Sequence, residues 1–109
     1  MFQDMLAMSS GNSGGTEIEF TIVSGMSAMT MFRKEDYSKF EIMINSINSG
    51  YPMSLIGSTD KTDYTSLKTW SATTSTYEDI LSYLGNYNYF YFKNTANIAA
   101  NITAKAKTV

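Results

Sequence analysis

The sequence predicts a mainly β protein, an antiparallel β-sandwich or small barrel with one short α-helix. Several short segments alternate apolar and polar side chains, which is the period of a strand with one buried face. Only one stretch of the body combines helical spacing with a capping residue, and strands and helices do not alternate regularly. Charged residues make up 17% of the 109 residues, below the usual level of about 25%, so Ser, Thr, Asn and Tyr must supply much of the polar surface.

The first half of the body contains the clearest strand patterns. Thr16–Ser24 alternates isoleucine and phenylalanine with glutamate and threonine. Tyr37–Ile44 places Phe40, Ile42 and Ile44 on one face. Two shorter strands are predicted at Ala28–Phe32 and Met53–Gly57. The turns between these strands fall at Arg33–Asp36 and Asn45–Pro52.

Two strands are predicted near the end of the chain, a strong one at Tyr87–Lys93 and a last one at Asn97–Val109 that could contain a bulge. The first is rich in aromatic residues, and its Phe90 and Phe92 should point into the core. Small residues on the last strand should make room for these rings, and they are Ala100, Ala104 and Ala106. A less regular strand is predicted at Tyr64–Ala72, after the polar loop Ser58–Asp63.

The predicted helix spans Ser75–Leu84. Ser75 or Thr76 can cap its N-terminus, and two acids fall in the first turn, where the helix dipole favours them. Gly85 is suited to end the helix. The apolar stripe of this helix comprises Ile80, Leu81 and Leu84.

The chain divides into an N-terminal arm with a flexible linker, residues 1–15, and a single β-rich domain, residues 16–109. Phe2, Met5 and Leu6 share one face of a helical pattern that is too short to form a stable helix by itself. Ser9–Gly15 has the composition of a flexible linker. The apolar tip is therefore either a docking arm or a disordered tail. We expect it to become ordered against a neighbouring chain.

The composition argues against several functional classes. The chain has no cysteine and no histidine, which removes thiolate nucleophiles, Cys-ligated metals and the commonest general base. The net charge is −2 and the basic residues are scattered, without the basic patch of a nucleic-acid-binding protein. No segment has the length of a membrane span or the pattern of a signal peptide. We therefore expect no enzymatic activity, no cofactor, no metal and no direct binding to nucleic acid or membrane.

Two acidic features could support chemistry but have simpler interpretations. Glu17 and Glu19 point from one face of a strand, and paired carboxylates can act on glycosides when a cleft holds them about 5–10 Å apart. We interpret them as an exposed face that discourages edge pairing. Asp60–Asp63 could offer oxygens to calcium, but it contains only two acids with a lysine between them. We interpret this segment as a solvated loop.

The aromatic segment Tyr87–Phe92 is the strongest candidate for a binding surface. The period of a strand places Tyr87, Tyr89 and Tyr91 on the face opposite to Phe90 and Phe92. Tyrosines with polar tips suit a protein or glycan interface, unless a helix or a second sheet covers them. Trp70 is a second aromatic candidate, either as a core residue or as a platform for a sugar ring.

The opening of the chain resembles small structural or tail-associated proteins of bacteriophages. It reads MFQDMLAMSSG and continues into a Gly/Ser stretch, so the resemblance is confined to residues 1–15. The resemblance implies a virion protein present in many copies. It also implies attachment to other virion proteins, or to copies of the same chain, through short arms and sheet faces.

Two functions therefore stand as expectations. The first is a non-enzymatic structural or assembly protein of a bacteriophage particle, for decoration, joining or the tail. The second is a carbohydrate- or cell-surface-binding module that uses Trp70 and the three tyrosines. A glycan-binding protein should show a concave site with one ring and several polar groups.

Overall fold

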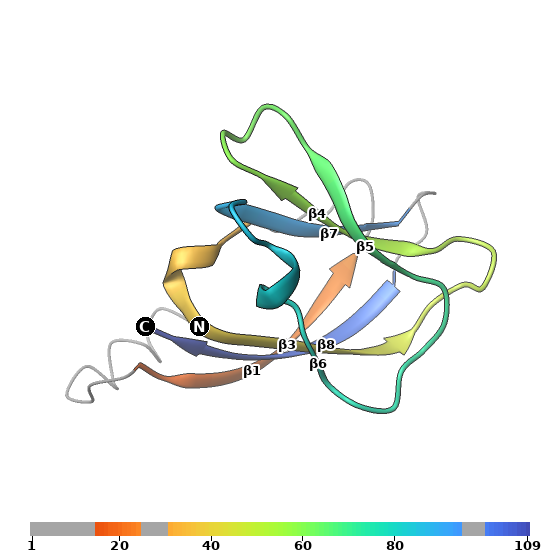
Figure 1. Ribbon diagram of the computed structural model, residues 1–109. Coiled ribbons are helices and arrows are strands. Elements are labelled where there is room, and N and C mark those ends of the chain that lie inside the picture. The colour runs from red at the N-terminus through yellow and green to blue at the C-terminus, as the bar shows by residue number, and fades with distance from the viewer. Residues whose placement is uncertain (1–14, 25–30, 95–99) are drawn as a thin grey trace.

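The computed structural model describes residues 15–24, 31–94 and 100–109, which form eight strands in two antiparallel sheets (Figure 1). The predicted docking residues Phe2, Met5 and Leu6 lie outside the described residues, as does most of the strand predicted at Ala28–Phe32. The strands are β1 (Glu17–Ser24), β2 (Phe32–Arg33), β3 (Tyr37–Ser46), β4 (Met53–Ser58), β5 (Thr65–Trp70), β6 (Glu78–Asp79), β7 (Tyr89–Asn94) and β8 (Ala100–Thr108).

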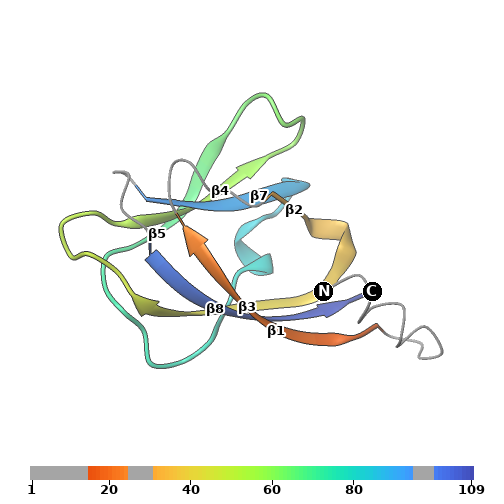
Figure 2. The same cartoon turned by 180° about the vertical axis from the view of Figure 1, so that it is seen from behind.

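The two sheets pack face to face as a β-sandwich. Sheet A has the strand order β1-β8-β3-β6, and sheet B has the order β2-β7-β4-β5. Front and back views show β4 and β7 in one layer and β3 and β8 in the other (Figures 1 and 2). The predicted mainly β class and the antiparallel β-sandwich are confirmed.

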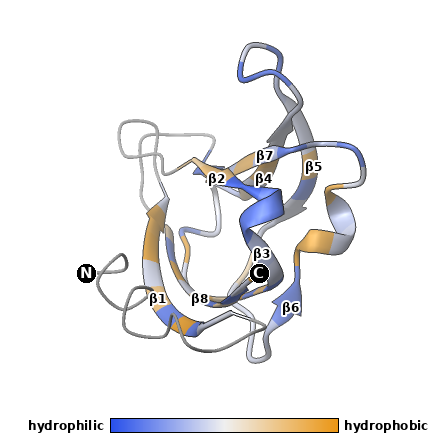
Figure 3. Cartoon of the chain, turned by 90° about the vertical axis from the view of Figure 1, so that its left-hand side faces the viewer, coloured by the Kyte–Doolittle hydropathy of each residue, from blue (hydrophilic) through white to orange (hydrophobic). Residues whose placement is uncertain are grey.

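The alternation that predicted the strands also places the core. On β1, Ile18 and Ile22 are buried while Glu17 and Glu19 are exposed, and Figure 3 shows this alternation as orange and blue bands. On β3, Phe40, Ile42 and Ile44 are all buried, as predicted. Strand β8 lies at the centre of sheet A, because it pairs along most of its length with β1 on one side and with β3 on the other.

The rings of Phe90 and Phe92 and the alanines of β8 belong to the same core, but they come from different sheets. Phe90 and Phe92 are buried on β7 in sheet B, and Ala100, Ala104 and Ala106 are buried on β8 in sheet A. Small residues on one inner face leave room for large rings on the other, as close packing requires. The prediction that the alanines make room for the phenylalanine rings is confirmed, but the two sets of residues face each other from opposite sheets.

The predicted helix Ser75–Leu84 is wrong. Its residues form the short strand β6 and a single 3-10 turn, η2 (Leu81–Tyr83), and η1 (Lys34–Asp36) is a second such turn. At Ile80 the backbone bonds with β3, because the Ile80 N–H donates to the Phe40 carbonyl at 3.0 Å, and the local hydrogen bonds that follow have 3-10 spacing. The Asp79 carboxylate accepts the Leu81 N–H at 3.1 Å, which also begins a turn. Ile80 and Leu84 are nevertheless fully buried, as the apolar stripe predicted.

A β-bulge on β5 explains the irregular pattern of that strand. The register with β4 shifts between Leu55↔Lys68 and Ile56↔Ser66, so Leu67 is the extra residue. Trp70 pairs with Met53, which is fully buried. The bulge therefore allows Trp70 to face the core while Ser66 and Thr69 face outward.

A candidate partner-binding face on sheet B

The outer face of sheet B presents a group of tyrosines and cations that we call the tyrosine face. Its residues are Arg33 on β2, Tyr89 and Tyr91 on β7, and Lys61 and Tyr64 in the loop between β4 and β5. The strand register brings Arg33 and Ser58 beside Tyr89, and Ile56 beside Tyr91. The face thus draws on two strands and one loop, and β4 lies beside them.

Tyr91 supports this face from beneath. Only 7% of Tyr91 is exposed, and its ring meets the ring of Tyr64 edge to face, with 5.6 Å between centroids. Burial raises the pKa of the Tyr91 hydroxyl, so the residue stays neutral at neutral pH. Tyr64 is 45% exposed and offers the accessible ring. Sequence analysis did not predict Tyr64 as part of a binding surface, because its position depends on how the loop folds over β7.

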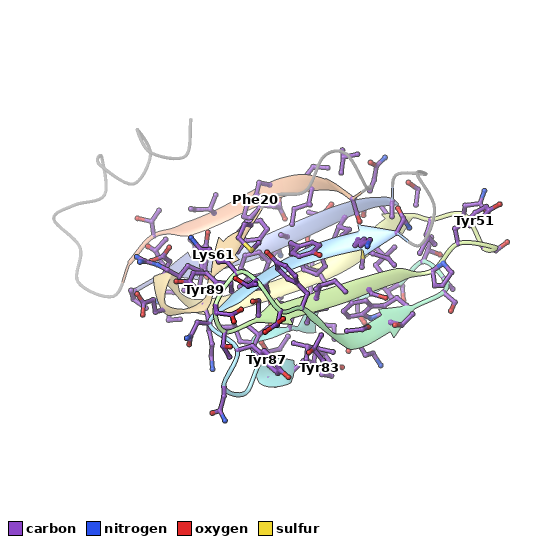
Figure 4. The ribbon with its side chains drawn as sticks, turned by 90° about the horizontal axis from the view of Figure 1, so that it is seen from above. Phe20, Tyr51, Lys61, Tyr83, Tyr87 and Tyr89 are labelled. Carbon is purple, nitrogen blue, oxygen red and sulfur yellow. The ribbon has the colours of Figure 1, made fainter. Side chains whose placement is uncertain are left out.

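Lys61 lies over Tyr89. Its ammonium nitrogen is 4.7 Å from the centroid of the Tyr89 ring, within the range of a cation–π interaction, and Figure 4 shows the two side by side. Tyr89 itself is half-buried, as the alternation of β7 predicts for a residue on the outer face. The predicted interface residue Tyr89 is therefore partly accessible and in contact with a cation.

The loop that holds Lys61 is closed by its own hydrogen bonds. One carboxylate oxygen of Asp60 accepts the N–H groups of Thr62 and Asp63 at 2.8 and 2.9 Å. The Asp63 and Thr62 N–H groups hold the pKa of Asp60 below its ordinary range. This carboxylate thus organises the turn, and the part of the chain that the structure describes contains no group of three acids or other ligands that could hold a metal. The solvated-loop interpretation fits these contacts better than a calcium site.

Tyr87 does not belong to the tyrosine face. Strand β7 begins at Tyr89, and the Tyr87 N–H donates to the Leu84 carbonyl in the preceding turn at 2.8 Å. The Tyr87 side chain packs over the inner side of Gly57, where an added Cβ would come within 3.1 Å of it. Figure 4 shows Tyr87 near Tyr83, apart from Tyr89. Of the three tyrosines predicted for an interface, only Tyr89 therefore remains as an accessible residue of this face, because Tyr91 is buried beneath Tyr64.

Trp70 is a buried residue and not an exposed platform. It is 7% exposed, and its indole N–H donates to one oxygen of Glu78 at 2.8 Å. The hydroxyl of Tyr83 donates to the other oxygen of Glu78, and Lys68 lies over the Tyr83 ring at 5.6 Å. The Glu78 carboxylate thus accepts hydrogen bonds from the Trp70 indole and from the Tyr83 hydroxyl. Of the two interpretations of Trp70, the core residue is the correct one.

The pKa of Glu78 should make stability depend on pH. Burial alone would raise this pKa, but hydrogen bonds from Tyr83 and Trp70 and the charge of Lys68 lower it. A lowered pKa means that the unfolded chain binds the proton first as the pH falls. The stabilisation is therefore present above the ordinary pKa of 4.5 and is lost in acid.

We expect the free energy of unfolding of the wild type to fall more steeply below this pH than the free energy of unfolding of Glu78→Gln. Urea unfolding at several pH values measures this, with the exposed Glu35→Gln as the control. Parallel curves for all three proteins would contradict the assignment.

The outer face of sheet A differs, because its charges are paired within the sheet. Lys39 contacts Glu17 at 3.5 Å and Glu41 at 3.7 Å. The Tyr77 hydroxyl donates to Glu19 at 3.0 Å, and Lys105 lies 4.4 Å from the centroid of the Tyr77 ring. A shallow groove of about 340 Å³ runs over Glu17 and Glu19, but these lysines share it. This arrangement favours the interpretation of the two glutamates as an exposed, charge-balanced face.

Comparisons with known proteins add little. No protein-family model matches the chain, and no curated protein matches it. Among solved structures, the crystal structure of Yersinia pseudotuberculosis-derived mitogen is similar, with 10% sequence identity, a TM-score of 0.43 and 87% of each chain covered. A likeness of this degree supports no statement about function. In the described residues, no helix has the length and apolar character needed to cross a membrane.

Proposed function

We propose that this chain is a non-enzymatic assembly protein that binds a protein partner through the tyrosine face of sheet B. The supporting observation is the contrast between the two outer faces. On sheet A, Lys39 forms ion pairs with Glu17 and Glu41, and Lys105 has Glu19 and Glu41 as cross-strand neighbours. By contrast, Lys61 and Lys93 make no ion pair with any described acid, and the cross-strand neighbour of Lys93 is Ser54. Tyrosine and arginine, which this face presents at Tyr64, Tyr89 and Arg33, are enriched at protein interfaces.

We further propose that the assembly is a bacteriophage particle. The support is the resemblance of residues 1–15 to small structural and tail-associated phage proteins. A small sandwich with one charge-balanced face and one tyrosine face suits a subunit that attaches by one side and leaves the other in water. The partners would be other virion proteins or further copies of this chain.

The glycan-binding alternative has less support. It depended on Trp70 and three tyrosines, but Trp70 is buried and Tyr87 packs over Gly57. The upper face of the Tyr89 ring is occupied by the Lys61 ammonium, which leaves less room for a stacked sugar. The assembly role therefore ranks first.

Density-gradient sedimentation of particles from cells that produce the phage tests this proposal. A tagged copy of the full chain should sediment with the particles, and antibody labelling in electron micrographs should place it on them. An unrelated soluble β-sandwich with the same tag is the control. Recovery of the chain only among soluble proteins would contradict the virion assignment.

A further inference from the structure

A cleft lies beside Tyr89 at the edge of the tyrosine face. Its volume is about 360 Å³, and its lining includes Lys61, Arg33, Asp36, Tyr37 and Tyr89. Two of these residues are cations and two bear phenolic hydroxyls that can donate hydrogen bonds. The set thus contains more donors than acceptors.

Arg33 is already occupied by neighbouring acids. Its guanidinium contacts Asp36 at 2.9 Å and Glu35 at 3.3 Å, and the Asp36 hydrogen bond raises the pKa of Arg33. Asp36 is therefore already paired with a cation within its own turn. Lys61 remains as the cation of the cleft without an acidic partner among the described residues.

Lys105 on sheet A is the counterpart of Lys61 and shows a lysine that has acids beside it. Lys105 also lies over a tyrosine ring, but its cross-strand neighbours are Glu19 on β1 and Glu41 on β3. Each strand beside Lys105 therefore places an acid opposite it. Lys61 has the same cation–π contact and lacks those acids, so it retains the capacity to bind an anion.

The loop places Lys61 in a costly backbone conformation. Its φ is +62°, the only positive value at a non-glycine residue in the described ranges. Ser58 accepts the Lys61 N–H at 2.8 Å, and the Tyr64 hydroxyl donates to the Lys61 carbonyl at 2.7 Å. Glycine would adopt this left-handed conformation at lower cost than lysine does. The presence of a lysine here therefore agrees with a binding role for its side chain.

We propose that this cleft binds the carboxylate of an acidic side chain from a protein partner. The carboxylate would contact the Lys61 ammonium and accept hydrogen bonds from the hydroxyls of Tyr37 or Tyr89, while Met31 contacts the aliphatic part of the acidic residue. An acidic side chain fits better than an acidic sugar, because Lys61 already covers a face of the Tyr89 ring and so limits stacking. The identity of the partner as a protein rests on the function proposed above.

Titration of the labelled full chain by NMR tests this site directly. The probes are a blocked tri-glutamate peptide, a tri-lysine peptide and glucuronate. We expect saturable shifts at Arg33, Lys61 and Tyr89 with tri-glutamate only. Lys61→Gln should weaken this binding by about tenfold, because it removes the cation without an acidic partner, whereas Lys105→Gln should leave it within about twofold.

Lys61→Gly separates binding from folding. Glycine accepts the positive φ without strain, so its melting temperature should equal or exceed that of the wild type while tri-glutamate binding is lost. Absence of saturable shifts with tri-glutamate would overturn the site, as would equal weakening by Lys61→Gln and Lys105→Gln. Tighter binding of glucuronate than of tri-glutamate would overturn the assignment of a protein partner. None of these results bears on whether the chain sediments with particles, so the two proposals can fail separately.

Discussion

Replacing Phe40 with alanine should destabilise the protein by about 3–5 kcal/mol, the cost of deleting a large buried ring. Phe40 is 0% exposed and bridges the two sheets from β3. Its ring lies 5.1 Å from that of Phe90 in sheet B and 5.0 Å from that of Tyr37, both edge to face. Removal of the ring leaves a cavity at the centre of the sandwich and breaks these aromatic pairs.

Urea unfolding with and without the substitution measures this loss. Val23→Ala is the control, because Val23 is 49% exposed on the outer face of β1 and should change stability by less than about 0.5 kcal/mol. A Phe40→Ala protein with wild-type stability would show that the two sheets do not share this core. A substitution that prevents folding altogether can be replaced by Phe40→Leu, for which a smaller loss is expected.

Gly57→Val should destabilise the protein by about 1–3 kcal/mol, although valine is favoured in strands. The reason is the inner side of β4, where an added Cβ would lie 2.6 Å from a methyl carbon of Leu67 and 3.1 Å from Tyr87. The bulge at Leu67 brings that side chain against Gly57, so the crowding comes from tertiary packing.

Ser54→Val on the outer side of the same strand is the matched control. Ser54 shares a hydrogen bond with Thr69 at 3.0 Å in an exposed position, and the added bulk meets solvent. Thermal melting should show a clear loss for Gly57→Val and a small change for Ser54→Val. Equal melting temperatures for both variants would show that Leu67 and Tyr87 move aside without cost.

The strands and the core could be predicted from the sequence because their signal is local. Ile18 and Ile22, or Phe40 and Ile42, are two residues or a multiple of two apart, and this spacing alone assigns them to one face of a strand. The segment Ser75–Leu84 could not be assigned in the same way. Ile80 and Leu84 suit a helical stripe, but the backbone of Ile80 bonds to Phe40, a partner that only the tertiary structure supplies.

The tyrosine face could be predicted only in part. The alternation along β7 correctly places Tyr89 and Tyr91 opposite to Phe90, but it does not reveal that the strand begins after Tyr87. Lys61 and Tyr64 join the face through a loop with a positive φ, and a lysine gives no sequence signal for that conformation. Burial of Tyr91 and Trp70 likewise depends on packing between segments distant in the sequence.

The partner-binding role of the tyrosine face can be tested by comparing two tyrosines on opposite outer faces, each of which lies beneath a lysine. Tyr89 lies under Lys61 on sheet B, and Tyr77 lies under Lys105 on sheet A; both are half-buried. The measurement is the fraction of the chain that sediments with particles for Tyr89→Ser and for Tyr77→Ser, with melting temperatures recorded beside it. We expect Tyr89→Ser to lose association by about tenfold or more, as for an interface hot spot, and Tyr77→Ser to retain it at a comparable melting temperature. Equal association of the two variants would contradict a partner-binding role for the tyrosine face.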